Sequence, residues 1–221
     1  MLTGFQFRAS RAILEYTFKD ISDIIGVHES TLIRFSRTKN LEYIRGHSQN
    51  IIAIRSFFED NHIIFPSQHT ITLSTNIHHS IQTQDTLTRF QLKAARIATG
   101  LTQDALSVYV RLSSSSISLL ESKDNTEYVS SNKIQISILK KFFERLGIIF
   151  HDDLTVELIK DPQILMKKNK QIRSTNSHAG QYTCRTIKYS CNTSYMVNTI
   201  TTIIASTTTT TTTSVRFINR Q

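Results

Sequence analysis

Apolar residues in the first part of the chain follow the spacing of short amphipathic helices. Those at 21, 24 and 25 recur at i, i+3 and i+4, which places them on one face of a helix. Residues 63–65 and 70–73 are instead short apolar or alternating runs, as in a β-hairpin. The pattern predicts helices that begin near Thr3, Thr17 and His28, a fourth helix over residues 49–61, and then the hairpin.

The same pattern returns 85 residues later. Residues 2–73 align with residues 87–158 without a gap, and 21 of the 72 aligned pairs are identical. Both copies open with Thr-x-x-Gln, a capping-box pattern that starts a helix. We infer a tandem duplication. The predicted domains are repeat 1 (residues 1–73), a linker (74–86), repeat 2 (87–158) and a tail (159–221).

Repeat 2 resembles the helix-turn-helix of the Cro/CI phage-repressor family, also called the xenobiotic-response-element family. The resemblance is carried by residues 103–107, 112–113, 117–118 and Glu121. Repeat 1 resembles a diverged copy, with Phe18 where the family prefers Gln. The resemblance implies a mainly α fold: two tandem repressor-like helix-turn-helix bundles, each followed by a short β-hairpin. It also implies a sequence-specific DNA-binding transcriptional regulator whose partner is double-stranded DNA.

In this family the third helix of each bundle lies in the major groove, where its first residues meet base edges. The resemblance implies that Gln103 contacts a phosphate. The residues that it places at the groove are His28, Glu29, Ser30, Thr31 and Arg34 in repeat 1, and Ser113, Ser114, Ser115, Ser116 and Ser118 in repeat 2.

Several of these residues have a second interpretation. Ser113 and His28 either only cap their helices or also contact a phosphate. Arg34 could bind guanine O6 and N7, or be a solvated surface residue, and Glu29 could accept a hydrogen bond from cytosine N4. These alternatives stay open on the sequence.

Repeat 2 departs from the family pattern at two points. Arg111 stands at the turn glycine, where a positive φ would cost a non-glycine residue roughly 1–2 kcal/mol, so a different turn is an alternative. No Lys or Arg lies between Leu112 and Ser122, which predicts weak DNA affinity for this repeat alone. Arg96 is expected to pair with Glu121.

The net charge of +9 does not itself indicate specific DNA binding. Each repeat carries a net charge of only +1, and residues 159–221 carry nine Lys/Arg against one Asp. That segment is rich in Ser, Thr and Asn and includes seven consecutive threonines, so we predict that it is largely disordered. It is either a solvated low-complexity extension, which we favour, or a basic arm for phosphates.

Other function classes find little support in the sequence. No window is long and apolar enough to cross a membrane, and no secretory signal is readable, so we expect a cytoplasmic protein. The eight histidines lack metal-site spacing, no nucleophile turn or phosphate-binding glycine loop occurs, and neither an enzyme nor a cofactor is expected.

Two questions of assembly and function remain open. The two repeats could form an intramolecular pseudo-dimer on a non-palindromic operator, or identical repeats of two chains could pair as a homodimer. The alternative function is a protein-interaction module, or a degenerate antitoxin-like regulator that keeps the fold and binds DNA weakly or not at all.

Overall fold

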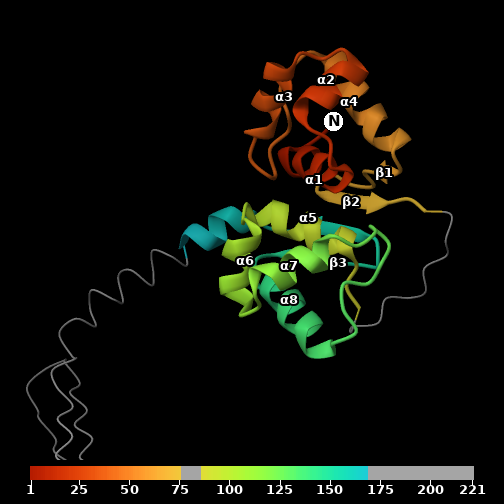
Figure 1. The fold of residues 1–221 in the computed structure, drawn as a ribbon. Coiled ribbons are helices and arrows are strands. Elements are labelled where there is room, and N and C mark those ends of the chain that lie inside the picture. The colour runs from red at the N-terminus through yellow and green to blue at the C-terminus, as the bar shows by residue number, and fades with distance from the viewer. Residues whose placement is uncertain (76–85, 169–221) are drawn as a thin grey trace, which may run out of the picture. The chain divides into compact units, whose positions relative to one another are not determined.

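The computed structural model describes residues 1–75 and 86–168, which fall within one compact unit, Met1–Asn169. The fold is mainly helical and includes one small antiparallel sheet (Figure 1). The mainly α prediction is confirmed at this level. Most of the predicted linker and nearly all of the predicted tail, including its threonine run, lie outside the described residues.

Repeat 1 folds as four helices and a short hairpin, close to the predicted bounds. The Thr3 hydroxyl accepts from the Gln6 amide at 3.3 Å while the Gln6 side chain accepts from the Thr3 amide at 3.0 Å, so the predicted capping box is confirmed. The elements are α1 (Gly4–Leu14), α2 (Phe18–Ile25), α3 (Glu29–Ser36), α4 (Ser48–Asp60), β1 (Ile63–Ile64) and β2 (Thr70–Leu73).

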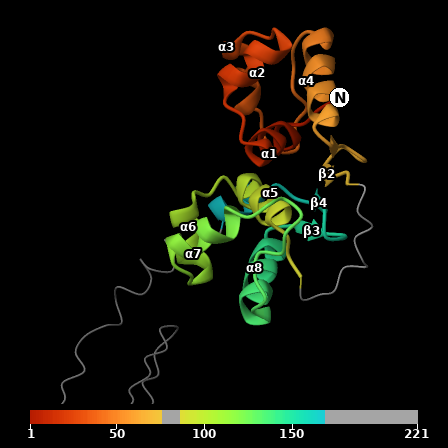
Figure 2. The same ribbon diagram turned by 45° about the vertical axis from the view of Figure 1, so that its right-hand side comes forward.

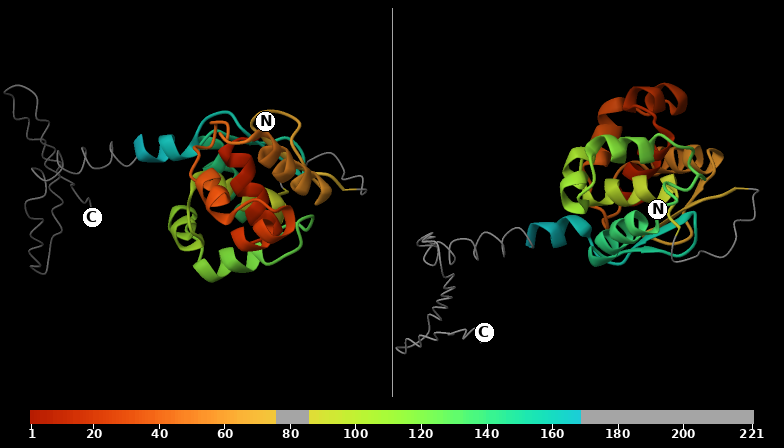
Figure 3. Two further views of the ribbon diagram at one scale, coloured as in Figure 1. Left: turned by 90° about the horizontal axis from the view of Figure 1, so that it is seen from above. Right: turned by 60° about the horizontal axis from the view of Figure 1, so that its bottom comes forward.

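Repeat 2 forms the same elements in the same order. Thr88 and Gln91 make the second capping box, and Thr102 caps the next helix by accepting from the Ala105 amide at 3.1 Å. The elements are α5 (Arg89–Thr99), α6 (Gln103–Val110), α7 (Ser114–Glu121), α8 (Lys133–Arg145), β3 (Ile148–Phe150) and β4 (Thr155–Leu158). Helical structure also covers residues 162–168, inside the segment predicted as a tail (Figure 3).

The two hairpins join into one four-stranded sheet with the order β1-β2-β4-β3. Strands β2 and β4 pair antiparallel, with Ile71 opposite Val156. These two residues occupy equivalent positions, 85 residues apart. On either side, Thr70 lies opposite Glu157, the equivalent of Thr72, and Thr72 lies opposite Thr155, the equivalent of Thr70. Such reciprocal pairing is the mark of a two-fold axis, here between two halves of a single chain.

Helices α1 and α5, which are also equivalent, pack against each other across the same axis (Figure 2). The buried apolar residues of both repeats form one hydrophobic cluster. At one end of this contact the nearly buried Arg89 donates to the Ile13 carbonyl at 3.1 Å and binds Glu15. At the other end Asn40 donates to the Ala98 carbonyl at 2.9 Å. The repeats therefore share a core as well as a sheet.

Candidate nucleic-acid interface

In repeat 1 the pair α2 and α3 is held by a tight turn. Gly26 follows α2 in the left-handed conformation with φ = 71°, and its amide donates to the Ser22 carbonyl at 2.9 Å. Ile21 from α2 and Leu32 from α3 are fully buried. The inward faces of both short helices are thus fixed, and the opposite face of α3 is left to the surface.

The first turn of α3 presents polar side chains to solvent. His28, Glu29 and Ser30 are exposed and Thr31 is half-buried. The His28 ring nitrogen Nδ1 accepts from the Ser30 amide at 3.2 Å and lies 2.7 Å from the Ser30 hydroxyl. His28 therefore caps α3, as both interpretations of the sequence require.

Arg34 lies one turn further along α3 and is exposed. Its guanidinium carbon is 5.4 Å from the centre of the Phe35 ring, within the range of a cation–π contact. A guanidinium held in this way offers two parallel N–H donors, the arrangement that suits a guanine edge or a phosphate.

In repeat 2 the pair α6 and α7 uses the same turn. Arg111 follows α6 with φ = 56° and ψ = 39°, and its amide donates back to Ser107 as Gly26 donates back to Ser22. The alternative of a different turn is therefore wrong. Repeat 2 keeps the left-handed backbone conformation at this position, although the residue is an arginine.

The serines that open α7 are largely engaged with one another. Ser113 caps the helix by accepting from the Ser116 amide at 3.0 Å, and its hydroxyl lies 2.9 Å and 2.6 Å from those of Ser115 and Ser116. Ser114 donates to the carboxylate of Asp104 in the first turn of α6. Ser118 is exposed on the same helix. A carboxylate thus stands at the start of α7, where phosphates would be repelled.

The side chain of Gln103 contacts Glu121. Its side-chain amide donates to Glu121 at 3.0 Å, and Glu121 is also paired with Arg96 through contacts of 2.5 Å and 2.7 Å. The predicted Arg96–Glu121 pair is confirmed, and the Gln103 amide belongs to this buried network. In repeat 1 Arg11 instead stacks over Phe18, 4.3 Å from the ring centre, and burial lowers the pKa of the Arg11 guanidinium.

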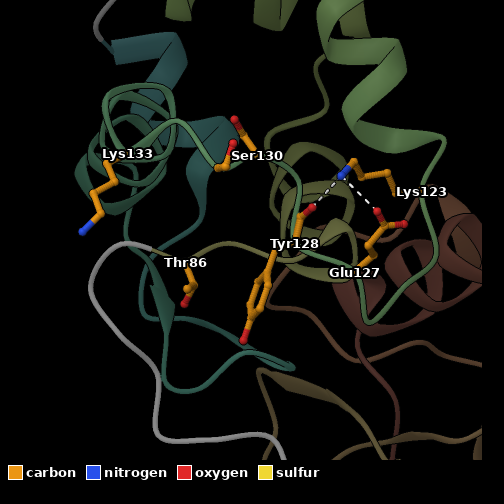
Figure 4. A pocket seen from close by; sticks show the side chains of 7 residues that line it. Thr86, Lys123, Glu127, Tyr128, Ser130 and Lys133 are labelled. Atoms are coloured by element: carbon orange, nitrogen blue, oxygen red, sulfur yellow. Dashed lines mark hydrogen bonds and ion pairs between the residues drawn. The ribbon is translucent and has the colours of Figure 1, made fainter.

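Cations near the two helices differ between the repeats. Arg37 and Arg45 are exposed beyond the end of α3, and their equivalents in repeat 2 are Ser122 and Ser130. In repeat 2 Lys123 donates to Glu127 at 3.0 Å and to the Tyr128 carbonyl at 2.8 Å. Lys123, Glu127 and Tyr128 line an open hollow of about 650 Å³ beside the loop between α7 and α8 (Figure 4). The other residues that line it are Thr86, Ser130, Ser131 and Lys133.

Comparisons of the chain with protein-family models, with curated proteins and with solved structures find no match. In the described residues no helix has the length and apolar character of a membrane span. Within the same residues no cluster of three or more His, Cys, Asp or Glu side chains is placed to hold a metal ion.

The sequence did not point to two features of the repeat 2 surface. Leu119, at the position equivalent to Arg34, is 68% exposed on the outer side of α7. Asp104, equivalent to Lys19, reaches the first residue of α7. The signal in the sequence is the alignment of the two repeats, in which Lys19 and Arg34 of repeat 1 are replaced by Asp104 and Leu119 of repeat 2.

Proposed function

We propose that this protein is a sequence-specific DNA-binding regulator in which the two repeats are tandem helix-turn-helix units acting as a covalent pseudo-dimer. The observation that carries the proposal is the reciprocal pairing of β2 with β4 around Ile71 and Val156. A two-fold relation between the repeats is also a two-fold relation between α3 and α7. Two half-sites on a duplex have the same relation, since many dimeric regulators match the symmetry of their operators.

Repeat 1 supplies most of the sequence readout in this proposal. Glu29 and Arg34 are both exposed on α3 and are groups that hydrogen-bond cytosine and guanine edges, and exposed Arg37 follows the helix. The corresponding face of α7 holds serines and Leu119. The operator is therefore expected to be asymmetric, with one strongly specified half and one weakly specified half.

Selection of bound sequences from random duplex DNA tests the proposal. The full chain is used at raised salt, because nonspecific phosphate binding by the basic segment weakens steeply with salt. The expected result is one enriched asymmetric motif. Failure to enrich any motif contradicts DNA recognition, while a palindromic motif contradicts the pseudo-dimer.

A pair of variants tests the role of α3. Arg34→Ala removes a bidentate donor, so affinity for the selected sequence should fall by an amount equivalent to about 1–3 kcal/mol and discrimination should relax at one base pair. Lys160→Ala removes the same charge from an exposed position after β4 and serves as the matched control. Equal effects of the two variants would show that Arg34 contributes only charge.

A protein-interaction module is the second candidate function. It is favoured by the surface of repeat 2, where exposed Leu119 and the Asp104–Ser114 contact replace basic groups. Leu119→Arg, which introduces the residue of repeat 1, separates the two functions. A DNA-binding repeat should gain affinity and a steeper salt dependence from the added cation, whereas loss of a bound protein without any gain on DNA would favour the module.

A further inference from the structure

Helix α8 exposes a row of apolar side chains. Ile134 and Ile138 are 72% and 40% exposed, and four-residue spacing continues the row to the half-buried Phe142. Tyr109 of α6 extends it sideways, with its ring centre 5.5 Å from that of Phe142. We call these four residues the α8 stripe. Single exposed apolar residues are ordinary, but a contiguous row is typical of a binding surface.

Repeat 1 provides an internal comparison, because α4 is the equivalent helix. Gln49 and Ala53 stand at the positions of Ile134 and Ile138. Phe57, equivalent to Phe142, is only 7% exposed and packs against Tyr16 with ring centres 5.3 Å apart. Ile24, equivalent to Tyr109, is 56% exposed, so repeat 1 has one exposed apolar residue at these four positions but no row, and the α8 stripe is not required for folding.

Two cations lie on the same face of α8. Lys141 and Arg145 are exposed and stand seven residues after Ile134 and Ile138, two helical turns along, and so share their side of the helix. The equivalent residues of repeat 1 are Ser56 and Asp60. Repeat 2 has therefore gained apolar surface at one end of the face and positive charge at the other.

We propose that the α8 stripe binds an amphipathic helix of a partner protein, one that presents apolar residues at four-residue spacing followed by acidic residues. The apolar half of such a helix buries Ile134 and Ile138, as in other helix-on-groove contacts. Its carboxylates pair with Lys141 and Arg145, which would otherwise lose hydration at an interface without compensation.

Charge argues against two other occupants. The C-terminal segment 159–221 carries nine Lys/Arg against one Asp, so it does not match a face with two cations. A second copy of the chain would bring two further cations to the interface, and on α8 only Glu144, three residues after Lys141, is spaced to offset one of them. An acidic helix satisfies both halves of the surface.

Fluorescence anisotropy with a synthetic helix tests the proposal. The probe is a labelled peptide of ~15 residues with Leu at four-residue spacing and Glu two turns beyond, titrated with the full chain. A peptide of the same composition with scattered Leu is its control. We expect saturable binding of the first peptide and affinity at least roughly tenfold lower for the second.

Variants of the chain locate the contact. Ile134→Gln with Ile138→Ala, which installs the residues of repeat 1, should weaken binding by roughly tenfold or more. Lys141→Glu with Arg145→Glu should weaken it as well, and a Lys-flanked peptide should bind that variant better than the Glu-flanked one. Ile52→Gln is the matched control, since Ile52 is 62% exposed on α4 outside the stripe.

Several results would overturn the proposal. These are equal binding of both peptides, unchanged binding by the Ile134/Ile138 variant with circular dichroism intact, or self-association of the chain that this variant abolishes. The last result would make the occupant a second copy. Binding to the selected DNA is measured in parallel and should be the same in wild type and in the Ile134/Ile138 and Ile52 variants, which keep the charge of the chain, so that their outcome is independent of the proposed regulator function.

Discussion

Three backbone positions in each repeat adopt the left-handed conformation. They are equivalent between repeats, and in every pair one copy has glycine while the other does not. The pairs are Glu15 with Gly100, Gly26 with Arg111, and His62 with Gly147. Because only glycine adopts positive φ without steric penalty, each non-glycine member is a place where the fold is maintained against local strain.

Arg111→Gly should stabilise the protein. The change relieves roughly 1–2 kcal/mol of backbone strain. It also lowers stability by about 0.5–1 kcal/mol, because glycine has more conformational freedom in the unfolded chain. The free energy of unfolding, measured by urea denaturation, should therefore rise by about 0.5–1 kcal/mol. No atom lies within 4 Å of a Cβ built on Gly26, so Gly26→Ala should lower stability by strain alone. A destabilised Arg111→Gly protein would contradict this account.

Glu121, the last residue of α7, makes an enclosed ion pair with Arg96 of α5. Its side chain is 3% exposed, and Arg96 supplies two contacts to it. Arg96→Ala leaves a buried carboxylate without its cation and should cost about 3–5 kcal/mol in urea denaturation. Lys39→Ala breaks the exposed Lys39–Glu42 pair and should leave the midpoint essentially unchanged. Similar midpoints for the two variants would show that the Arg96 pair adds no more than a surface contact.

At the scale of elements, the packing of α1 on α5 is asymmetric at its two ends. Near the end of α1, Glu15 binds Arg89 and lies 2.5 Å from the Lys93 ammonium. Position 100, equivalent to Glu15, is glycine, and the carboxylate at the other end of the contact is instead that of Asp161, which accepts from Asn40 at 2.8 Å. The first end is thus ionic, with Glu15 contacting two cations of α5 directly, whereas at the second end Asn40 donates both to the Ala98 carbonyl and to Asp161.

The ionic end should make the inter-repeat contact sensitive to acid. The hydrogen bond from Lys93, and then the charges of Lys93 and Arg89, lower the pKa of Glu15. A depressed carboxyl pKa contributes stability above the ordinary value, and that contribution is lost as the pH falls through the lowered pKa. The urea midpoint of wild type should thus exceed that of Glu15→Gln near neutral pH and converge with it in acid. A difference that persists at low pH would contradict the assignment.

Helices and their caps were readable from the sequence because both depend on neighbours in the chain. Thr3, Thr17 and Ser113 each cap a helix at the predicted place. The joining of the two hairpins was not readable, since β2 pairs with β4 across 85 residues and short apolar strands do not specify their partners. At the candidate interface the exposure of α3 followed from its apolar spacing, whereas the contact of Asp104 with Ser114 depends on how α6 crosses α7.

At the scale of the whole molecule, the two repeats should unfold together. They share a sheet, the α1–α5 contact and one hydrophobic cluster, so neither keeps its core when the other is lost. Ile71→Ala, at the centre of the two-fold and fully buried, should lower hydrogen-exchange protection by about 2–5 kcal/mol in both repeats. Protection lost in repeat 1 while repeat 2 keeps its own would show instead that the repeats are independent domains.

The pairing of Ile71 with Val156 also bears on how such a protein can change. A dimer of identical chains receives every substitution twice, once on each side of its axis, and must tolerate both. Encoding both halves in one reading frame removes that constraint. One half can hold an arginine in the α1–α5 contact where the other has glycine, as at Arg89 and Gly4, and each outer surface is free to acquire a task that its twin does not share.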